Sequence, residues 1–137
     1  MAGGLQTYRQ VSVSTMDRGQ LLLAMYEGGI GFLKQAVAAH ERYDIERFSY
    51  FLRRGQDVIG ELMSSLDPTP APQLAGRLER LYEFMLFQLS EANLTRAAGP
   101  VRQVTPLLAR VYEAYRRVIL NPTPEVRSIL ASPPRIR

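Results

Sequence analysis

The chain has 137 residues, 46% hydrophobic and 22% charged, with a formal net charge of +4 and a pI near 9.8. This length is typical of one domain with a core of its own. The absence of cysteine excludes disulfides and thiolate chemistry, and the single histidine leaves one candidate base for a serine triad and makes a zinc site unusual.

Residues 1–16 are predicted to form an irregular N-terminal arm, because they show no helical periodicity. The segment carries four apolar side chains with small or polar residues between them: Leu5, Tyr8, Val11 and Val13. Four apolar anchors in so short a segment favour an arm that docks on the rest of the chain. A frayed terminus is the alternative. The segment also lacks the basic and apolar regions of a secretory signal.

A first helix is predicted from Asp17 to about Glu41, because Asp17 with Gln20 three residues later forms a capping box. Its apolar positions step by three and four, at Leu22, Met25, Tyr26, Gly29, Leu33, Ala36 and His40. Three glycines between residues 28 and 31 would each cost roughly 1 kcal/mol inside a helix. We therefore expect another backbone or side chain to approach the helix at this stretch. His40 is expected to be a packed residue or a partner of the helix dipole.

A second helix is predicted after the cap residue Asp44, and it should end before Asp67-Pro68. Its apolar positions again follow helical spacing, at Phe48, Phe51, Leu52, Gly55, Val58, Ile59, Leu62 and Leu66. Three prolines at alternate positions from residue 68 then predict a stiff connection.

A third helix is predicted over about residues 72–95, with Thr69 or Ala71 as its cap. Its apolar positions are Leu74, Leu78, Leu81, Met85, Leu89 and Ala92. Further large apolar side chains, Tyr82, Phe84, Leu86 and Phe87, extend beyond that face. A helix apolar on more than one side either keeps a surface for a partner or is buried more deeply. We favour the partner surface; burial beneath the arm or a terminal helix is the alternative.

A fourth helix is predicted from Pro100 to just before Asn121. Its apolar positions are Val101, Val104, Leu108, Val111, Tyr115, Val118 and Ile119. Pro106 falls within its first two turns, where we expect a bend and no break. A short fifth helix is predicted from about residue 123 to residue 131, followed by a loose tail.

These segments predict an all-α fold: an antiparallel up-down four-helix bundle with a short fifth helix near the C-terminus and an irregular N-terminal arm. The predicted division is an arm over 1–16, the bundle over 17–121, and the short helix and tail over 122–137. Short connections rich in proline and glycine join the helices, as is usual when neighbouring helices are antiparallel.

No motif for catalysis, cofactor binding or metal binding emerges from the sequence. The clustered glycines lie inside a helical pattern and follow no strand, and no Glu-x-x-His motif is present. We therefore expect no enzyme activity, no cofactor and no metal site. The arginine pairs 53–54 and 116–117 lie in helical patterns, so no nucleic-acid partner is expected. No apolar run reaches the ~18 residues of a membrane span, so we expect no membrane insertion and a cytoplasmic location.

The first of four motifs is Tyr8-x3-Ser12-Val13-x-Thr15-x3-Gly19-x-Leu21-x3-Met25-Tyr26-x-Gly28. It resembles the N-terminal signature of the FliS family, the flagellin-specific export chaperones. The second, Gly55-Gln56-Asp57-Val58-Ile59-x-Glu61-Leu62, is similar to the family's A-Q-x-I-I-x-E-L segment. Leu81-Tyr82-Glu83-Phe84-Met85 through Glu91-Ala92-Asn93-Leu94 resembles L-Y-D-Y-M…E-A-N-L, and Glu113-Ala114-Tyr115-Arg116 resembles D-A-W-K. Together they cover about residues 5–120, in the family's order and spacing.

The resemblance implies a four-helix bundle without catalytic activity. It implies a protein that binds the disordered C-terminal segment of flagellin in the cytoplasm, prevents premature polymerisation, and delivers flagellin to the type III export gate. The alternative function is a non-catalytic bundle that self-associates and acts as a structural or regulatory protein. A homodimer in the absence of the client is compatible with either function.

The resemblance also suggests which residues act. It assigns Leu5 and Tyr8, with Val11 and Val13, to an arm that covers the client groove and contacts the export gate. The groove itself is predicted from apolar side chains outside the helix seams: Tyr50, Phe51, Phe84, Phe87 and Leu94, with Tyr26 and Tyr82 beneath them. Phe51 also belongs to the seam of its own helix, and Tyr26 and Tyr82 could equally be core residues.

Five residues, at three sites, depart from the family pattern. Tyr115 stands where the family usually has tryptophan, and Arg96-Ala97 replaces the usual Asn-Asp before the fourth helix. The latter change is expected to weaken that helix cap by about 1 kcal/mol. Phe87-Gln88 replaces an arginine pair, which makes this surface more apolar.

Overall fold

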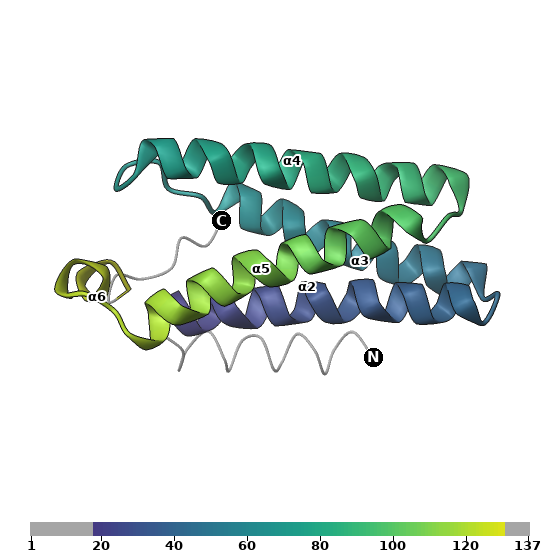
Figure 1. The fold of residues 1–137 in the computed structure, drawn as a ribbon, viewed down its shortest axis with the longest axis horizontal. Helices are drawn as coiled ribbons and strands as arrows, with labels where there is room; N and C mark the ends of the chain where they lie inside the picture. The colour runs from purple at the N-terminus through teal and green to yellow at the C-terminus, as the bar shows by residue number, and fades with distance from the viewer. Residues whose placement is uncertain (1–17, 131–137) are drawn as a thin grey trace.

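The computed structural model describes residues 18–130 and shows five helices (Figure 1). They are α2 (Arg18–Glu41), α3 (Ile45–Ser64), α4 (Pro72–Thr95), α5 (Gly99–Leu120) and the short α6 (Pro124–Leu130). The predicted arm over 1–16, its anchors Leu5, Tyr8, Val11 and Val13, and the predicted cap Asp17 lie outside the described residues. Residues 18–130 contain no strand.

The four long helices form a bundle in which successive helices pack side by side. Helix α2 packs against α3 and α5, and α4 packs against the same two helices. Helices α2 and α4 therefore face each other across the middle of the bundle. The predicted all-α bundle with a short additional helix is confirmed.

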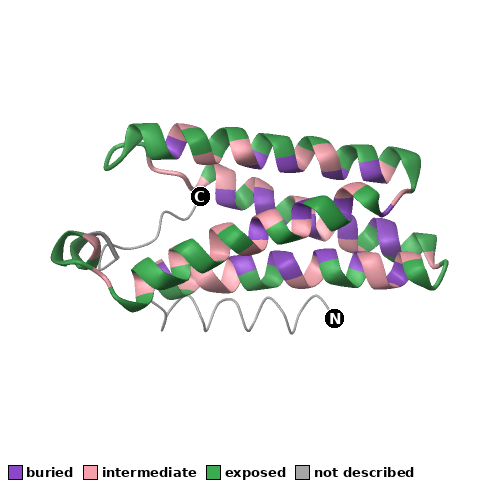
Figure 2. Cartoon of the chain, in the orientation of Figure 1, coloured by how far each residue is buried: buried purple, intermediate pink, exposed green. Residues whose placement is uncertain are grey.

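The core lies along the axis of the bundle, where the buried residues of the four helices meet (Figure 2). It is built from the residues that recur every three or four positions, because 3.6 residues per turn bring those onto one face. The largest fully buried side chains are Tyr26, Leu33, Phe48, Leu52, Ile59, Leu62, Tyr82, Met85, Leu89, Val101, Val104 and Leu108.

Two of the predicted core positions are exposed. Leu74 is 55% exposed and Val118 is 48% exposed. In α4, Ala75 and Tyr82 are buried, so the inward face of that helix is rotated from the predicted one. In α5, no residue after Leu108 is fully buried, because the bundle covers its second half less completely.

Glycine permits the close approach of α2 and α3. A Cβ atom on Gly55 would lie 2.6 Å from Leu33 Cδ2, and one on Gly29 would lie 3.0 Å from Val58 Cγ1. The expected close approach is therefore confirmed at Gly29. At Gly28 and Gly31, an added Cβ would meet no atom of residues 18–130 within 4 Å.

One end of the bundle is fixed by contacts between its two turns. His40, in the last turn of α2, bonds through Nε2 to the backbone oxygen of Arg96 (2.9 Å), and its ring meets the ring of Phe48 edge-on at 5.0 Å. Arg96 closes α4 in the left-handed conformation (φ 59°). Its guanidinium donates to Ser49 Oγ of α3 at 2.8 Å. His40 is thus a packed residue, as expected.

The helix starts differ in how they are capped. The side chain of Asp44 accepts a hydrogen bond from the backbone N–H of Arg47 (3.2 Å), so the predicted cap of α3 is confirmed. The cap positions of α4 and α5 are Ala71 and Ala98, and neither forms a side-chain cap. Both helices have proline in the first turn, where a missing N–H costs little.

Candidate binding surface

The described residues contain no cluster of metal-ligating side chains and no helix able to cross a membrane. Between residues 18 and 130, no three His, Asp or Glu side chains lie together in a way that could hold a metal ion. Within the same range, no helix combines the length and the apolar character that crossing a membrane requires.

Tyr26 and Tyr82, predicted to lie beneath a groove, are core residues in the structure. They are 0% and 1% exposed, and their hydroxyl groups bond to each other across the bundle between α2 and α4. Burial raises the pKa of both phenols well above their ordinary value near 10. The pair therefore stays neutral, and a partner could reach it only if the helices separated.

Helix α5 adds two further tyrosines to this core pair. The ring of Tyr115 lies 5.5 Å from the ring of Tyr26, and that of Tyr112 lies 6.3 Å away. Tyr112 donates to Glu27 Oε1 at 2.8 Å, and this hydrogen bond raises the pKa of its phenol. Burial raises the pKa of Tyr115. Tyr115 thus fills an aromatic position beside the core, half-buried.

Tyr50 and Phe51 form an aromatic cluster on the outside of α2 and α3. The ring of Phe51 stacks on Phe32 at 6.5 Å, and Tyr50 meets Phe51 edge-on at 5.3 Å. The guanidinium of Arg54 lies over the Phe32 ring at 5.4 Å, a cation–π arrangement. The ring of Phe51 is therefore partly covered by neighbouring side chains, whereas Tyr50 is 52% exposed.

Phe84, Phe87 and Leu94 form what we name the α4 surface. Their exposed fractions are 46%, 61% and 78%, respectively. At about 100° per residue they lie within about 80° of one another around the helix, on the side away from Met85 and Leu89. The exposure of Phe84, Phe87 and Leu94 agrees with the partner-surface interpretation of this helix, whereas Tyr82 is buried.

By the register of α3 against α4, Leu94 of the α4 surface lies level with the Tyr50–Phe51 cluster, whereas Phe84 and Phe87 lie farther along the bundle. Hydrogen bonds from Gln56 to Ser90 (3.3 Å) and from Arg96 to Ser49 fix the register of α3 against α4. With a rise of 1.5 Å per residue, this register separates Phe87 from Tyr50 by about 12 Å along the bundle. No aromatic ring contact joins the two groups within residues 18–130. The predicted site residues are thus the buried pair Tyr26 and Tyr82, the Tyr50–Phe51 cluster, and the α4 surface.

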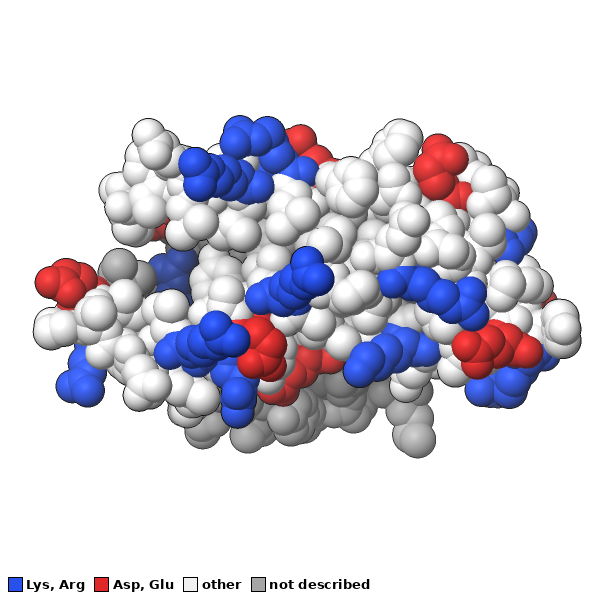
Figure 3. Space-filling model, in the orientation of Figure 1, with Lys and Arg blue, Asp and Glu red and all other residues white. Residues whose placement is uncertain are grey.

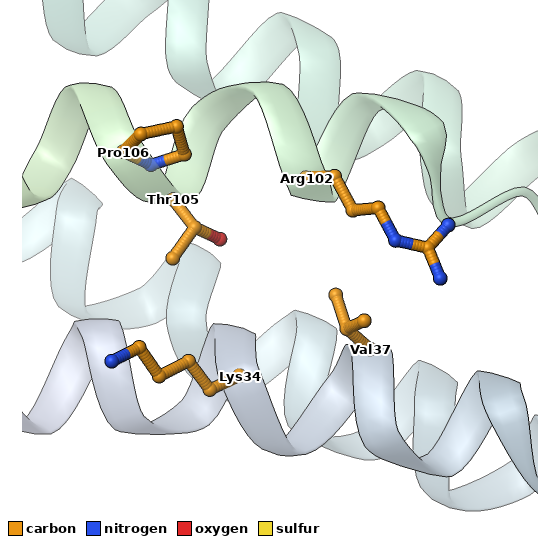
Figure 4. Close-up of a pocket in the computed structure, with 5 residues that line it drawn as sticks. All are labelled: Lys34, Val37, Arg102, Thr105 and Pro106. Carbon is orange, nitrogen blue, oxygen red and sulfur yellow. The ribbon is translucent and has the colours of Figure 1, made fainter.

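A pocket that the sequence analysis missed lies between α2 and α5 (Figure 4). It has a volume of about 280 Å³ and is lined by Lys34, Val37, Arg102, Thr105 and Pro106. Lys34 and Val37 come from α2 and face the other three residues across the gap. The only feature of the sequence that pointed to this pocket was Pro106, because proline inside a helix is uncommon. From the sequence, Pro106 predicted only a bend in the helix.

Comparison with known proteins identifies relatives over almost the whole chain. The family model described as flagellar protein FliS matches residues 1–122. The flagellar secretion chaperone FliSB of Pseudomonas aeruginosa is 34% identical over 111 residues, which is 78% of this chain and 88% of that protein. The flagellar secretion chaperone FliS of Bacillus subtilis is 30% identical over 82% of this chain and 83% of its own. The protein of the same name from Salmonella typhimurium is 28% identical over 85% and 90%.

Proposed function

The chain belongs to the FliS family, and we propose that it is a flagellar export chaperone that binds the disordered C-terminal segment of flagellin. In this role it prevents premature polymerisation of flagellin in the cytoplasm and delivers it to the flagellar export gate. Its relatives from several bacteria are named flagellar secretion chaperones, which supports a non-catalytic role in flagellar export.

The observation that carries the proposal is the α4 surface. A bundle of this size normally gives each helix a solvated polar face, yet α4 leaves two phenylalanines and a leucine exposed within 11 residues of chain. Apolar side chains spaced along one helix suit an amphipathic client segment, because such a segment buries its apolar face against them. The net gain is roughly 25 cal/mol for each Å² of apolar surface removed from water.

Binding of this kind would also keep flagellin from polymerising. The terminal segment of flagellin assembles by packing its apolar face against copies of itself, so a chaperone that covers that face competes with assembly. The client loses conformational entropy when it becomes ordered on the chaperone, so a large interface still permits release.

We assign the N-terminal arm a separate role. Leu5, Tyr8, Val11 and Val13 would cover the client surface in the free protein and contact the export gate in the loaded one. The arm then competes with the client, so deleting residues 1–15 should leave flagellin binding unchanged or tighter, as measured by titration with labelled flagellin. A clear loss of affinity would make the arm part of the client site.

The proposal is tested by co-expressing the tagged chain with flagellin from the same genome and measuring the flagellin retained. We expect stoichiometric retention by the wild-type chain. Phe84→Asp and Phe87→Asp should each weaken binding by about 2 kcal/mol or more, roughly thirty-fold, because a charge would replace an apolar anchor.

Val118→Asp is the matched control, because Val118 is 48% exposed, close to the 46% of Phe84, and lies on another helix. It should retain flagellin normally. Circular dichroism should show wild-type helicity in all three variants; a loss of helicity at position 84 or 87 would mean that these side chains support the fold. Absence of flagellin from the wild-type complex would refute the proposed function itself.

A further inference from the structure

Among the four long helices, the net positive charge lies on α5. Helix α5 carries four arginines and a single carboxylate, Glu113. Helix α2 has two Lys or Arg residues and two Glu, and α3 and α4 together have five arginines and six carboxylates. The excess of cations among the long helices is therefore a property of α5.

These charges lie on the outward side of α5. Arg102, Pro106, Arg110, Glu113 and Arg117 recur at intervals of three or four, so they share one face. That face is opposite the buried Val101, Val104 and Leu108. In Figure 3, Lys and Arg side chains lie over α5 and the adjoining part of α2 with carboxylates among them, and others lie over α4.

The carboxylates on this side already have partners within the bundle. Glu41 of α2 pairs with Arg102 at 3.3 Å, and Glu113 lies 3.9 Å from Arg116. Glu27 accepts the hydrogen bond of Tyr112. On this side, Lys34, Arg110 and Arg117 form no ion pair with another residue between 18 and 130. We name the face formed by these three cations and the hollows between them the basic surface.

The hollows of the basic surface have apolar floors. In the pocket between α2 and α5, the hydroxyl of Thr105 donates to the backbone oxygen of Val101 at 2.7 Å, so it is already satisfied by its own helix. Pro106 offers no N–H, and Val37 is apolar. A second hollow of about 350 Å³ runs along α5 and is lined by Ala109, Arg110, Glu113, Ala114 and Arg117.

We propose that the basic surface docks an acidic amphipathic segment of a second protein partner. Small apolar side chains of that segment would fill the two hollows, and its carboxylates would pair with Lys34, Arg110 and Arg117. Charge complementarity of this kind sets the choice of partner and the rate of encounter. Docking at the basic surface does not depend on which client the α4 surface binds. The residues of the basic surface belong to α2 and α5, and they bind through ion pairs.

The side chains of the basic surface favour a peptide over other polyanions. A nucleic-acid site would interleave exposed aromatic side chains with the cations, whereas the other residues that line the two hollows are alanine, valine, threonine, proline and Glu113, whose carboxylate already lies beside Arg116. A membrane-bound helix would present large apolar residues for insertion, which the centre of this face lacks.

The test uses the full chain and a fluorescently labelled synthetic amphipathic helix made of leucine, alanine and glutamate. Its counterpart has glutamine at every glutamate position. We expect fluorescence anisotropy to show binding of the acidic peptide at least about tenfold tighter than that of its counterpart, and to weaken as salt is raised. The combined variant Lys34→Glu, Arg110→Glu, Arg117→Glu should lose at least about tenfold in affinity.

The control is Arg77→Glu with Arg80→Glu, which reverses two exposed cations of α4 and should leave the peptide affinity unchanged. Equal binding of the two peptides, or equal affinity of the triple variant and the wild type, would overturn the proposal. So would tighter binding to vesicles containing phosphatidylglycerol than to the acidic peptide. Flagellin retention should survive the triple substitution; its loss would make this face part of the client site and end the case for a second partner.

Discussion

At the scale of single residues, Gly55 marks the tightest contact between α2 and α3. A methyl group there would lie 2.6 Å from Leu33 Cδ2, and Leu33 is fully buried. We expect Gly55→Ala to lower the free energy of unfolding by about 1–3 kcal/mol, because the clash outweighs the gain in helix propensity. Urea denaturation followed by circular dichroism measures the change.

Gly60 provides the matched comparison in the same helix. A Cβ atom added there would meet no atom of the described part of the chain within 4 Å. Gly60→Ala should therefore raise the free energy of unfolding by about 0.5–1 kcal/mol, because alanine narrows the unfolded ensemble without strain. Shifts of equal sign and size at the two positions would contradict the close approach at Gly55.

The buried phenols of Tyr26 and Tyr82 depend on each other for hydrogen bonding. Tyr82→Phe leaves the hydroxyl of Tyr26 buried without its partner, which should cost about 1–3 kcal/mol of stability. Replacing both tyrosines by phenylalanine removes both hydroxyls, so the double variant should be more stable than additivity predicts. A double-mutant cycle in denaturant gives the coupling, and strictly additive losses would show that the hydroxyls act separately.

The same pair sets how stability responds to alkaline pH. Burial raises the pKa of Tyr26 and Tyr82 in the folded protein, so the folded state keeps protons that unfolded phenols release near pH 10. The contribution of these two phenols to the stability of the folded protein is fully present below pH 10 and is lost as the pH rises above 10. The double phenylalanine variant should therefore show a shallower loss of stability above pH 10.

At the scale of the elements, α4 begins without a side-chain cap. Ala71 has the extended backbone of a cap residue (φ −152°) but no hydroxyl or carboxylate to offer. Ala71→Ser should stabilise the protein by about 1 kcal/mol, because its Oγ can accept one of the free N–H groups of the first turn. Thermal melting measures the gain.

Ala98→Ser at the start of α5 is the control for that prediction. Ala98 is 3% exposed and its backbone is helical (φ −85°, ψ −13°), so a hydroxyl there would be buried and badly placed to cap. We expect no gain in melting temperature. Equal stabilisation at the two positions would mean that something other than capping geometry is responsible.

Helix boundaries could be predicted from the sequence because local chemistry sets them. Asp44 caps α3 through its own side chain, and Pro72 stands at the start of α4. The rotation of a helix about its own axis could not be predicted in the same way, because it depends on the shape of the neighbouring helices. Helix α4 has apolar residues on most of its circumference, so periodicity alone could not decide between Leu74 and Tyr82 for the core.

At the scale of the whole molecule, the exposed apolar α4 surface bears on how the chain associates. Such a surface either receives a client or pairs with another copy. We expect light scattering to give a one-to-one complex with a flagellin C-terminal peptide, whatever the state of the free chain. A dimer that is indifferent to the peptide would favour the alternative of a self-associating structural bundle.

The candidate site was only partly predictable because exposure is a property of the assembled bundle. Phe84, Phe87 and Leu94 were identified as apolar residues outside the seam, and they are exposed. Tyr26 and Tyr82 belong to the core, which depends on how α2 and α4 face each other. The cations of α5 look scattered along the chain, yet their spacing places them on one face once the helix is formed.

The gathering of four tyrosines beside α5 also has an optical consequence. The chain has seven tyrosines and no tryptophan, so its intrinsic ultraviolet emission comes from phenol rings alone. With the rings of Tyr26 and Tyr115 only 5.5 Å apart, excitation can pass between them, and much of the signal reports the interior. A tryptophan placed at Phe87 would be the only indole in the molecule. Excited at wavelengths that phenols do not absorb, it would give a reading of the α4 surface free of any contribution from the core.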